Sequence, residues 1–112
     1  MVQTDWNASD PALRPPKYQR RRADMFRGIV ELIEDQPHYK IVSKDDAAAR
    51  LKAERKGGLL GGTEDVEIWV EGEPSGPVSV HMKADARVGL LSLGQGKRSI
   101  REFTRLLHYR QS

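Results

Sequence analysis

The sequence predicts an α+β domain: a two-layer α/β sandwich in which two helices cover one face of a four-stranded antiparallel meander, in the order α-β-β-β-β-α. Three observations support this fold. Apolar and polar residues alternate through residues 78–86, apolar residues recur at helical spacing near both ends of the chain, and short turn-forming segments separate the strands. A chain of 112 residues has the length of one domain. We divide it into an N-terminal arm, residues 1–16, and a single domain, residues 17–110.

The arm is rich in proline and polar residues, which predicts a flexible or extended segment. Trp6 and Leu13 are its exceptions, and either could dock on the domain or on a partner. The first helix is expected over residues 18–35, because one apolar stripe runs along it and Pro37 then ends it. That stripe consists of Phe26, Ile29, Val30 and Ile33.

The four strands are expected at residues 38–44, 47–56, 65–72 and 78–86. The polar residues of the last strand, Ser79 and His81 among them, are expected to face water. The second contains three consecutive alanines, so a short helix is its alternative. Four glycines predict a mobile loop over residues 57–62. A second glycine-bearing turn leads to the last helix, which is expected from Lys97. The predicted core between sheet and helices comprises Phe26, Ile29, Ile68, Val80, Phe103 and Leu107.

The composition restricts the possible chemistry. With no cysteine, the chain has no disulfide, zinc-thiolate site or thiol nucleophile. The formal charge of +3 is spread over 19 basic and 16 acidic residues, which is only mildly basic. We find neither an apolar run of about 20 residues, as a membrane span requires, nor a signal peptide, and expect a soluble intracellular protein.

The segment from Ala84 to Ile100 resembles the C-terminal signature of the DUF1499 family, and the resemblance extends over roughly residues 18–107. The Glu64-Asp65 pair before the third strand is also similar to the family pattern. Ser92 and Gly96 depart from it, since the family has Asp and Asn there. The matching positions are Arg87, Gly89, Gly94, Arg98 and Ile100. The resemblance implies no established activity. It implies an occurrence in bacteria and plastid-bearing lineages. Since we find no signal peptide or membrane span, we expect a cytoplasmic or plastid-stromal location.

An anion-binding site is one candidate function of the last turn. Gly94 to Arg98 opens a helix after a strand, but the Walker pattern fails because Arg98 follows Lys97 where Ser or Thr is required. Free N–H groups at a helix start, with Arg87, Lys97 and Arg98, could still bind an anion. Alternatively, the glycines serve the turn and Arg87 pairs with Asp65 or Asp85.

Other candidate chemistry is weaker. His38, His81 and His108 are not at metal-ligand spacing, and a serine paired with His81 lacks a third orienting group. Glu67 and Glu71 flank Trp69 and could bind a sugar, although a solvated strand face is the commoner arrangement. Nucleic acid would use basic side chains of the two helices: Arg20, Arg21, Arg22, Lys97, Arg98, Arg101 and Arg105.

The sequence thus favours a non-enzymatic binding or adaptor domain, an accessory subunit of a larger protein assembly, with no cofactor or metal. Its partner-binding residues are expected to be Trp6, Leu59, Leu60 and Trp69. An anionic-ligand or nucleic-acid binder that uses the basic helix ends is the alternative, and an enzyme of unidentified class is the third hypothesis.

Overall fold

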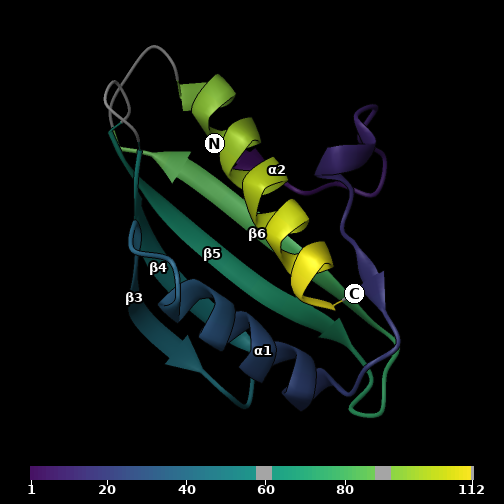
Figure 1. The fold of residues 1–112 in the computed structure, drawn as a ribbon. Helices are drawn as coiled ribbons and strands as arrows, with labels where there is room; N and C mark the ends of the chain where they lie inside the picture. The colour runs from purple at the N-terminus through teal and green to yellow at the C-terminus, as the bar shows by residue number, and fades with distance from the viewer. Residues whose placement is uncertain (58–61, 88–91, 112) are drawn as a thin grey trace.

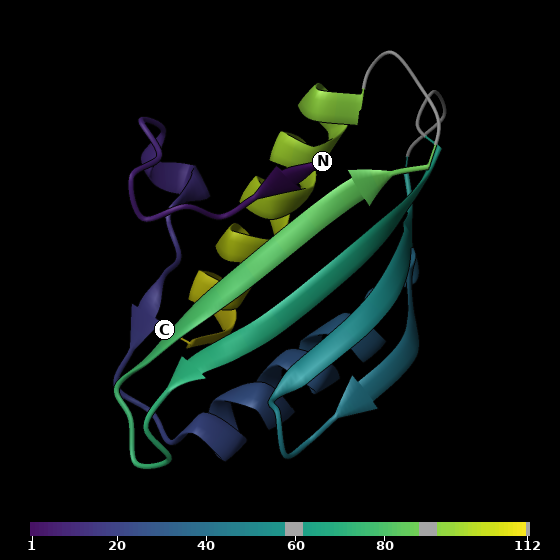
Figure 2. The same cartoon turned by 180° about the vertical axis from the view of Figure 1, so that it is seen from behind.

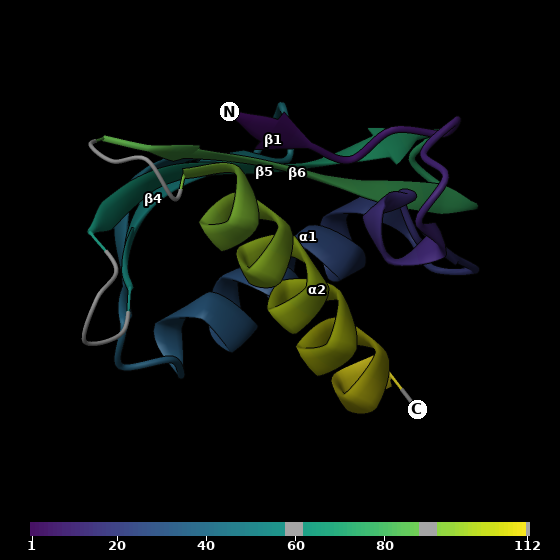
Figure 3. The same cartoon turned by 90° about the horizontal axis from the view of Figure 1, so that it is seen from above.

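The computed structural model describes residues 1–57, 62–87 and 92–111. The helices are α1 (Arg22–Glu34), α2 (Ser92–Gln111) and the short 3-10 helix η1 (Pro11–Leu13). The strands are β1 (Val2–Gln3), β2 (Lys17–Tyr18), β3 (Tyr39–Asp45), β4 (Arg50–Lys56), β5 (Thr63–Gly72) and β6 (Val78–Ala86). Figures 1 and 3 show α1 and α2 together on one side of the sheet, and Figure 2 shows the opposite, outer face.

The predicted α+β class is confirmed, and the predicted number of strands is wrong. The sheet is antiparallel and six-stranded, in the order β1-β6-β5-β4-β3, and β2 also pairs with β6. The four predicted strands form the meander β3 to β6. The two additional strands come from residues 1–18, because the arm pairs with the edge of β6 that the meander alone would leave open.

The arm follows β6 along most of its length. Val2 lies opposite Ala84, and Lys17 lies opposite Ser79. Between these two points, Thr4 N–H donates to Met82 O at 2.9 Å, while its Oγ1 accepts from Met82 N–H at 3.1 Å. Val80 N–H donates to Pro16 O at 3.0 Å. The arm is therefore docked on β6 through β1 and β2, with η1 between them, and it seals an edge of the sheet.

The first helix begins four residues later than predicted, since Lys17–Tyr18 is strand β2. Arg22, its first residue, donates to the carbonyl oxygens of Val70, Ala47 and Ala48 at 2.7–3.2 Å. It thereby fastens α1 to β5 and to the turn before β4. The short-helix alternative for the three alanines is wrong: they form this turn, and Ala49 has a φ of 51°, outside the right-handed helical region.

The predicted core is confirmed. All six of its residues are at most 3% exposed and belong to one hydrophobic cluster. The last helix begins at Ser92 rather than Lys97, so Gly94 and Gly96 lie within α2. Gly96 is buried, and a Cβ there would approach Val2 Cγ2 to 2.7 Å. This glycine allows α2 to lie close to β1, which explains why a larger residue does not stand there.

The other edge of the sheet, β3, is protected in a different way. Its pairing with β4 shifts between Ile41 and Ser43, so Val42 is an inserted residue that is 58% exposed. Lys44 lies opposite the buried Leu51, in the inward register of a strand at the sheet edge. A bulge and an inward charge both disfavour the addition of a further strand. Neither edge of this sheet is thus suited to strand pairing with a partner.

Candidate functional site

Two tryptophans that are far apart in the sequence meet on the outer face of the sheet. Trp69 on β5 pairs with His81 on β6, and their rings are stacked with centroids 5.4 Å apart and planes at 10°. Trp6 from the arm contacts the same histidine edge-on, at 5.7 Å and 79°. We call Trp69, His81 and Trp6 the aromatic row. Each ring pair of this kind contributes about 0.5–1.5 kcal/mol beyond the burial of its area.

A cation stands at each end of the aromatic row. The Arg50 guanidinium lies 4.7 Å from the Trp69 ring centroid, and Lys17 Nζ lies 5.1 Å from that of Trp6. Arg50 also bonds to Glu67, which fixes its position on the outer face. Both distances fall within the range of cation–π attraction, so these rings already bind cations within the chain.

Hydrogen bonds from the backbone on either side of Trp6 hold this residue in place. Asp5 N–H donates to Leu13 O at 2.9 Å, and Leu13 is itself buried in the core. Asn7 N–H donates to Asp5 Oδ1 at 2.9 Å, which closes the turn that carries Trp6. The ring is nevertheless 48% exposed. The fold therefore presents a fixed but accessible indole.

His81 is buried beneath this arrangement, although the strand pattern predicted that its side of β6 faces water. Trp6 covers it, and the side chain is only 7% exposed. Burial lowers the pKa of His81 below its ordinary value, although the Glu71 carboxylate acts in the opposite direction. His81 is consequently held towards its neutral form.

Ser79, His81 and Glu71 lie together but not as a hydrolytic triad. Ser79 Oγ is 2.9 Å from His81 Nε2, and Glu71 Oε2 is 3.3 Å from the same nitrogen. In a triad, the serine and the carboxylate bind opposite nitrogens of the imidazole, so that one orients the ring and the other loses its proton. This geometry suits a hydrogen-bonded surface cluster.

Two hollows lie against the aromatic row. One, of about 410 Å³, is lined by Trp6, Lys17, Pro77 and Val78 among others. The other, of about 370 Å³, is lined by Gln3, Thr4, Asp5, Trp6, Trp69, Glu71 and His81. Glu71 and Trp6 belong to both. The outer face thus carries two adjoining depressions that share a wall.

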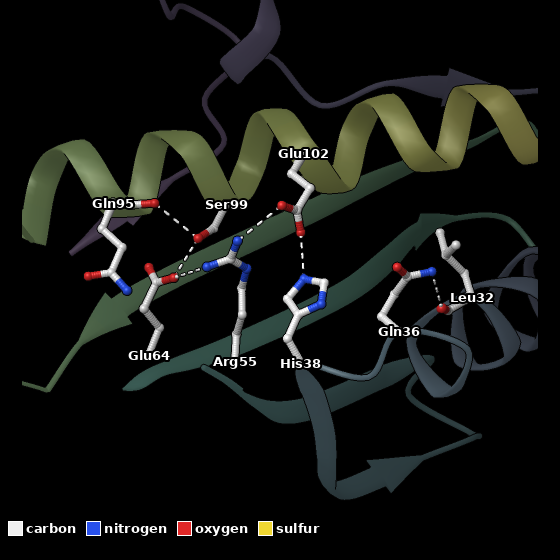
Figure 4. A network of polar contacts seen from close by, with 8 residues as sticks. All are labelled: Leu32, Gln36, His38, Arg55, Glu64, Gln95, Ser99 and Glu102. Carbon is white, nitrogen blue, oxygen red and sulfur yellow. Dashed lines mark hydrogen bonds and ion pairs between the residues drawn. The ribbon is translucent and has the colours of Figure 1, made fainter. Parts of the chain in front are cut away.

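A second polar cluster lies on the inner face, between the sheet and α2 (Figure 4). Arg55 on β4 donates to Glu64 on β5 at 3.2 Å and to Glu102 on α2 at 3.1 Å. Glu64 also accepts from Ser99, and His38 Nε2 lies 2.8 Å from Glu102. The Glu64 side chain is fully buried and that of Arg55 is 11% exposed. We call these five residues the inner charge network, and it joins both layers of the fold.

Burial and pairing within the inner charge network shift its titrations. Burial would raise the pKa of Glu102, but hydrogen bonds from His38 and Arg55 outweigh it and leave the pKa below its ordinary value. Burial raises the pKa of Tyr39, which packs beside Arg55 and remains a neutral phenol. Three buried atoms have no partner within the described residues: Tyr39 Oη, Arg55 Nε and Glu64 Oε2.

Arg87, a residue of the predicted anion site, has acidic partners within the chain. Arg87 donates to Asp65 at 2.8 Å and lies 3.0 Å from Glu54, on the outer face. The hydrogen bond from Arg87 lowers the pKa of Asp65. Lys97 and Arg98 are exposed on α2, which covers the inner face. The alternative interpretation, in which Arg87 pairs with Asp65, matches this contact.

Of the predicted partner-binding residues, Trp6 and Trp69 are brought together on either side of His81. Leu59 and Leu60 lie outside the described residues. Sequence reasoning missed the inner charge network, although the alternation of β4 and β5 carried a signal for it. The inward-facing positions of β4 and β5 recur at every second residue, and this period continues to Arg55 on β4 and to Glu64 on β5. These two residues are directly opposite each other in the sheet.

The described residues contain neither a membrane-spanning helix nor a metal-binding cluster. No helix among them is long and apolar enough to cross a membrane, and no three of their His, Asp or Glu side chains lie close enough to hold a metal ion.

Comparison with known proteins places the chain in a family. A search of curated proteins finds no match. The sequence profile described as protein of unknown function (DUF1499) matches residues 1–107, which include the arm. The chain therefore belongs to the DUF1499 family.

Proposed function

We propose that this domain is a non-enzymatic binding domain, an accessory subunit of a larger protein assembly, whose partner binds the outer face around Trp6. The observation that carries the proposal is the state of Trp6, which is fixed by the arm, 48% exposed and adjoined by two hollows. Tryptophan anchors beside pockets dominate the binding energy of many protein interfaces.

The protected edges support the choice of this face. The arm occupies the β6 edge, and the bulge and Lys44 disfavour pairing at the β3 edge. The helices cover the inner face (Figure 3). A partner then has the outer face as its extended docking surface, where aromatic rings are surrounded by charged residues, as in an interface core with a polar rim.

The geometry at His81 supports a role without catalysis. Ser79 and Glu71 both approach Nε2, and the imidazole is buried under Trp6. A nucleophile–base pair needs a ring whose second nitrogen is oriented by another group.

The test compares Trp6→Ala with Tyr109→Ala as a matched control. Tyr109 is the other strongly exposed aromatic residue of the described chain, at 84%, and it lies on α2. The tagged full chain is purified from its native host, and the copurifying partner is quantified together with the unfolding free energy of each variant. We expect Trp6→Ala alone to release the partner, at low and high salt alike, because apolar burial is weakly screened. Retention by Trp6→Ala, or equal loss from both variants, contradicts the proposal.

One observation favours a second candidate, a polyanion-binding role of α2. Lys97, Arg98 and Arg105 are exposed on this helix and have no ion pair within the part of the chain that is described. A partner held by these charges would dissociate steeply with added salt. Lys97→Glu combined with Arg98→Glu would then release it, whereas Trp6→Ala would not.

A further inference from the structure

The smaller hollow on the outer face has an unusual combination of groups. Its wall contains all three rings of the aromatic row and two carboxylates, Asp5 and Glu71. Gln3 and Thr4, both uncharged, complete its described lining. Although the chain has 19 lysines and arginines, none belongs to this lining. On a protein of net positive charge, this is a hollow of negative charge.

The rings of the aromatic row are suited to cations, as the chain itself demonstrates. Arg50 and Lys17 each lie within 5.1 Å of an indole centroid. Neither of these cations lines the smaller hollow. The attraction arises from the negative potential of the ring faces, and it strengthens when solvent is excluded. His81 adds no opposing charge, because burial holds it towards its neutral form.

The two carboxylates keep hydrogen-bonding capacity for a ligand. Glu71 Oε1 accepts from Trp69 Nε1 at 3.1 Å, and Asp5 Oδ1 accepts from Asn7 N–H at 2.9 Å. These bonds fix both side chains. An ionised carboxylate offers about four acceptor positions, so each retains positions for an incoming donor.

We propose that the smaller hollow binds the cationic head group of an arginine or lysine side chain presented by the protein partner. The inference rests on the proposed function and names the chemistry that the outer face recognises. A volume of about 370 Å³ accommodates one such head group. The adjoining hollow, lined by Pro77 and Val78, receives a neighbouring apolar side chain of the same segment. This second hollow is why a protein segment fits better than a free quaternary ammonium ion.

The test uses the isotope-labelled full chain and two capped peptides, Gly-Arg-Leu-Gly and the same peptide with citrulline, the uncharged isostere of arginine. The chain has only two tryptophans, both in the wall of the hollow, so their indole N–H resonances report binding directly. We expect the arginine peptide to shift both resonances and to bind about tenfold tighter than the citrulline peptide, as for one charge-assisted contact.

Glu71→Gln and Asp5→Asn remove one charge each while preserving shape. Each substitution should weaken the binding of the arginine peptide about fivefold or more and leave the affinity for the citrulline peptide unchanged. Asp85→Asn is the matched control, because Asp85 is 58% exposed on the same face while Glu71 is 59% exposed. Equal binding of the two peptides, or equal effects of all three substitutions, overturns the inference. Tetramethylammonium binding tighter than the arginine peptide also overturns it, in favour of a free cation.

The two proposals fail separately. If Trp6→Ala releases the partner but the arginine peptide shows no preference over citrulline, the proposed function stands and the cation inference is wrong. If the partner is retained by Trp6→Ala, the proposed function is wrong whatever the peptides do.

Discussion

Removal of the Arg55 guanidinium should destabilise the domain much more than removal of the whole buried ion pair. Arg55→Met leaves Glu64, which is fully buried, with Ser99 as a hydrogen-bond donor but without a cation. Loss of one partner from a buried pair costs about 3–5 kcal/mol. Glu102 adds little to this loss, because its side chain is 27% exposed and keeps His38. We therefore expect a loss of about 4 kcal/mol, a large part of the stability of a small domain.

The double variant Arg55→Met with Glu64→Leu supplies the contrast. It removes both buried charges, so its unfolding free energy should lie within about 1–2 kcal/mol of the value for the unsubstituted protein. Urea unfolding followed by circular dichroism at pH 7 measures both values, with equal m-values as the check on a common mechanism.

Two results would contradict a decisive role for the Arg55–Glu64 charge pair. A loss below about 1 kcal/mol for Arg55→Met would mean that Glu64 is solvated or compensated elsewhere. A double variant as unstable as the single one would mean that shape, rather than charge, determines the effect.

Four further outcomes follow from the packing and the pKa shifts. Phe103→Ala should cost about 3–5 kcal/mol in chemical denaturation, and a loss below ~1 kcal/mol would show that α2 does not pack as described. Gly96→Ala should cost about 1–3 kcal/mol through its contact with Val2, and Val2→Gly should restore part of it. The pKa of Glu102 is lower in the folded protein than its ordinary value of 4.5, so its ionised form stabilises the fold above pH 4.5. This stabilisation is lost as the pH falls through the lower folded pKa, and Glu102→Gln should flatten the plot of unfolding free energy against pH in that range. Deletion of residues 1–4 should expose the β6 edge and promote self-association in light scattering; a strictly monomeric variant would contradict the edge-sealing role.

The main strands and the core could be predicted because their signal is local. On β5, Val66, Ile68 and Val70 alternate with polar residues, and this period alone assigns the inner face. The same period predicted that Ser79 and His81 face water, which is wrong because the arm covers them. Alternation states which face a side chain occupies, but it does not state what lies above that face.

The arm strands could not be predicted in the same way. Each of β1 and β2 has two residues, too few to show any period, and each exists because β6 offers free backbone groups. The meeting of Trp6 with His81 is likewise a long-range contact without a local signature. The inner charge network is an intermediate case, since opposed charges at Arg55 and Glu64 follow from strand register once the hairpin is correctly aligned.

The arm links the stability of the sheet to the proposed binding site. Its residues around Thr4 satisfy the β6 edge, and the next turn fixes Trp6 over His81 through the Asp5–Leu13 hydrogen bond. The entropic cost of fixing Trp6 therefore arises when the domain folds and not when the partner binds. A partner meets an indole that is already in position. Such preorganisation lowers the cost of association. It also means that a substitution that frees the arm should weaken partner binding even where it leaves every residue of the hollow unchanged.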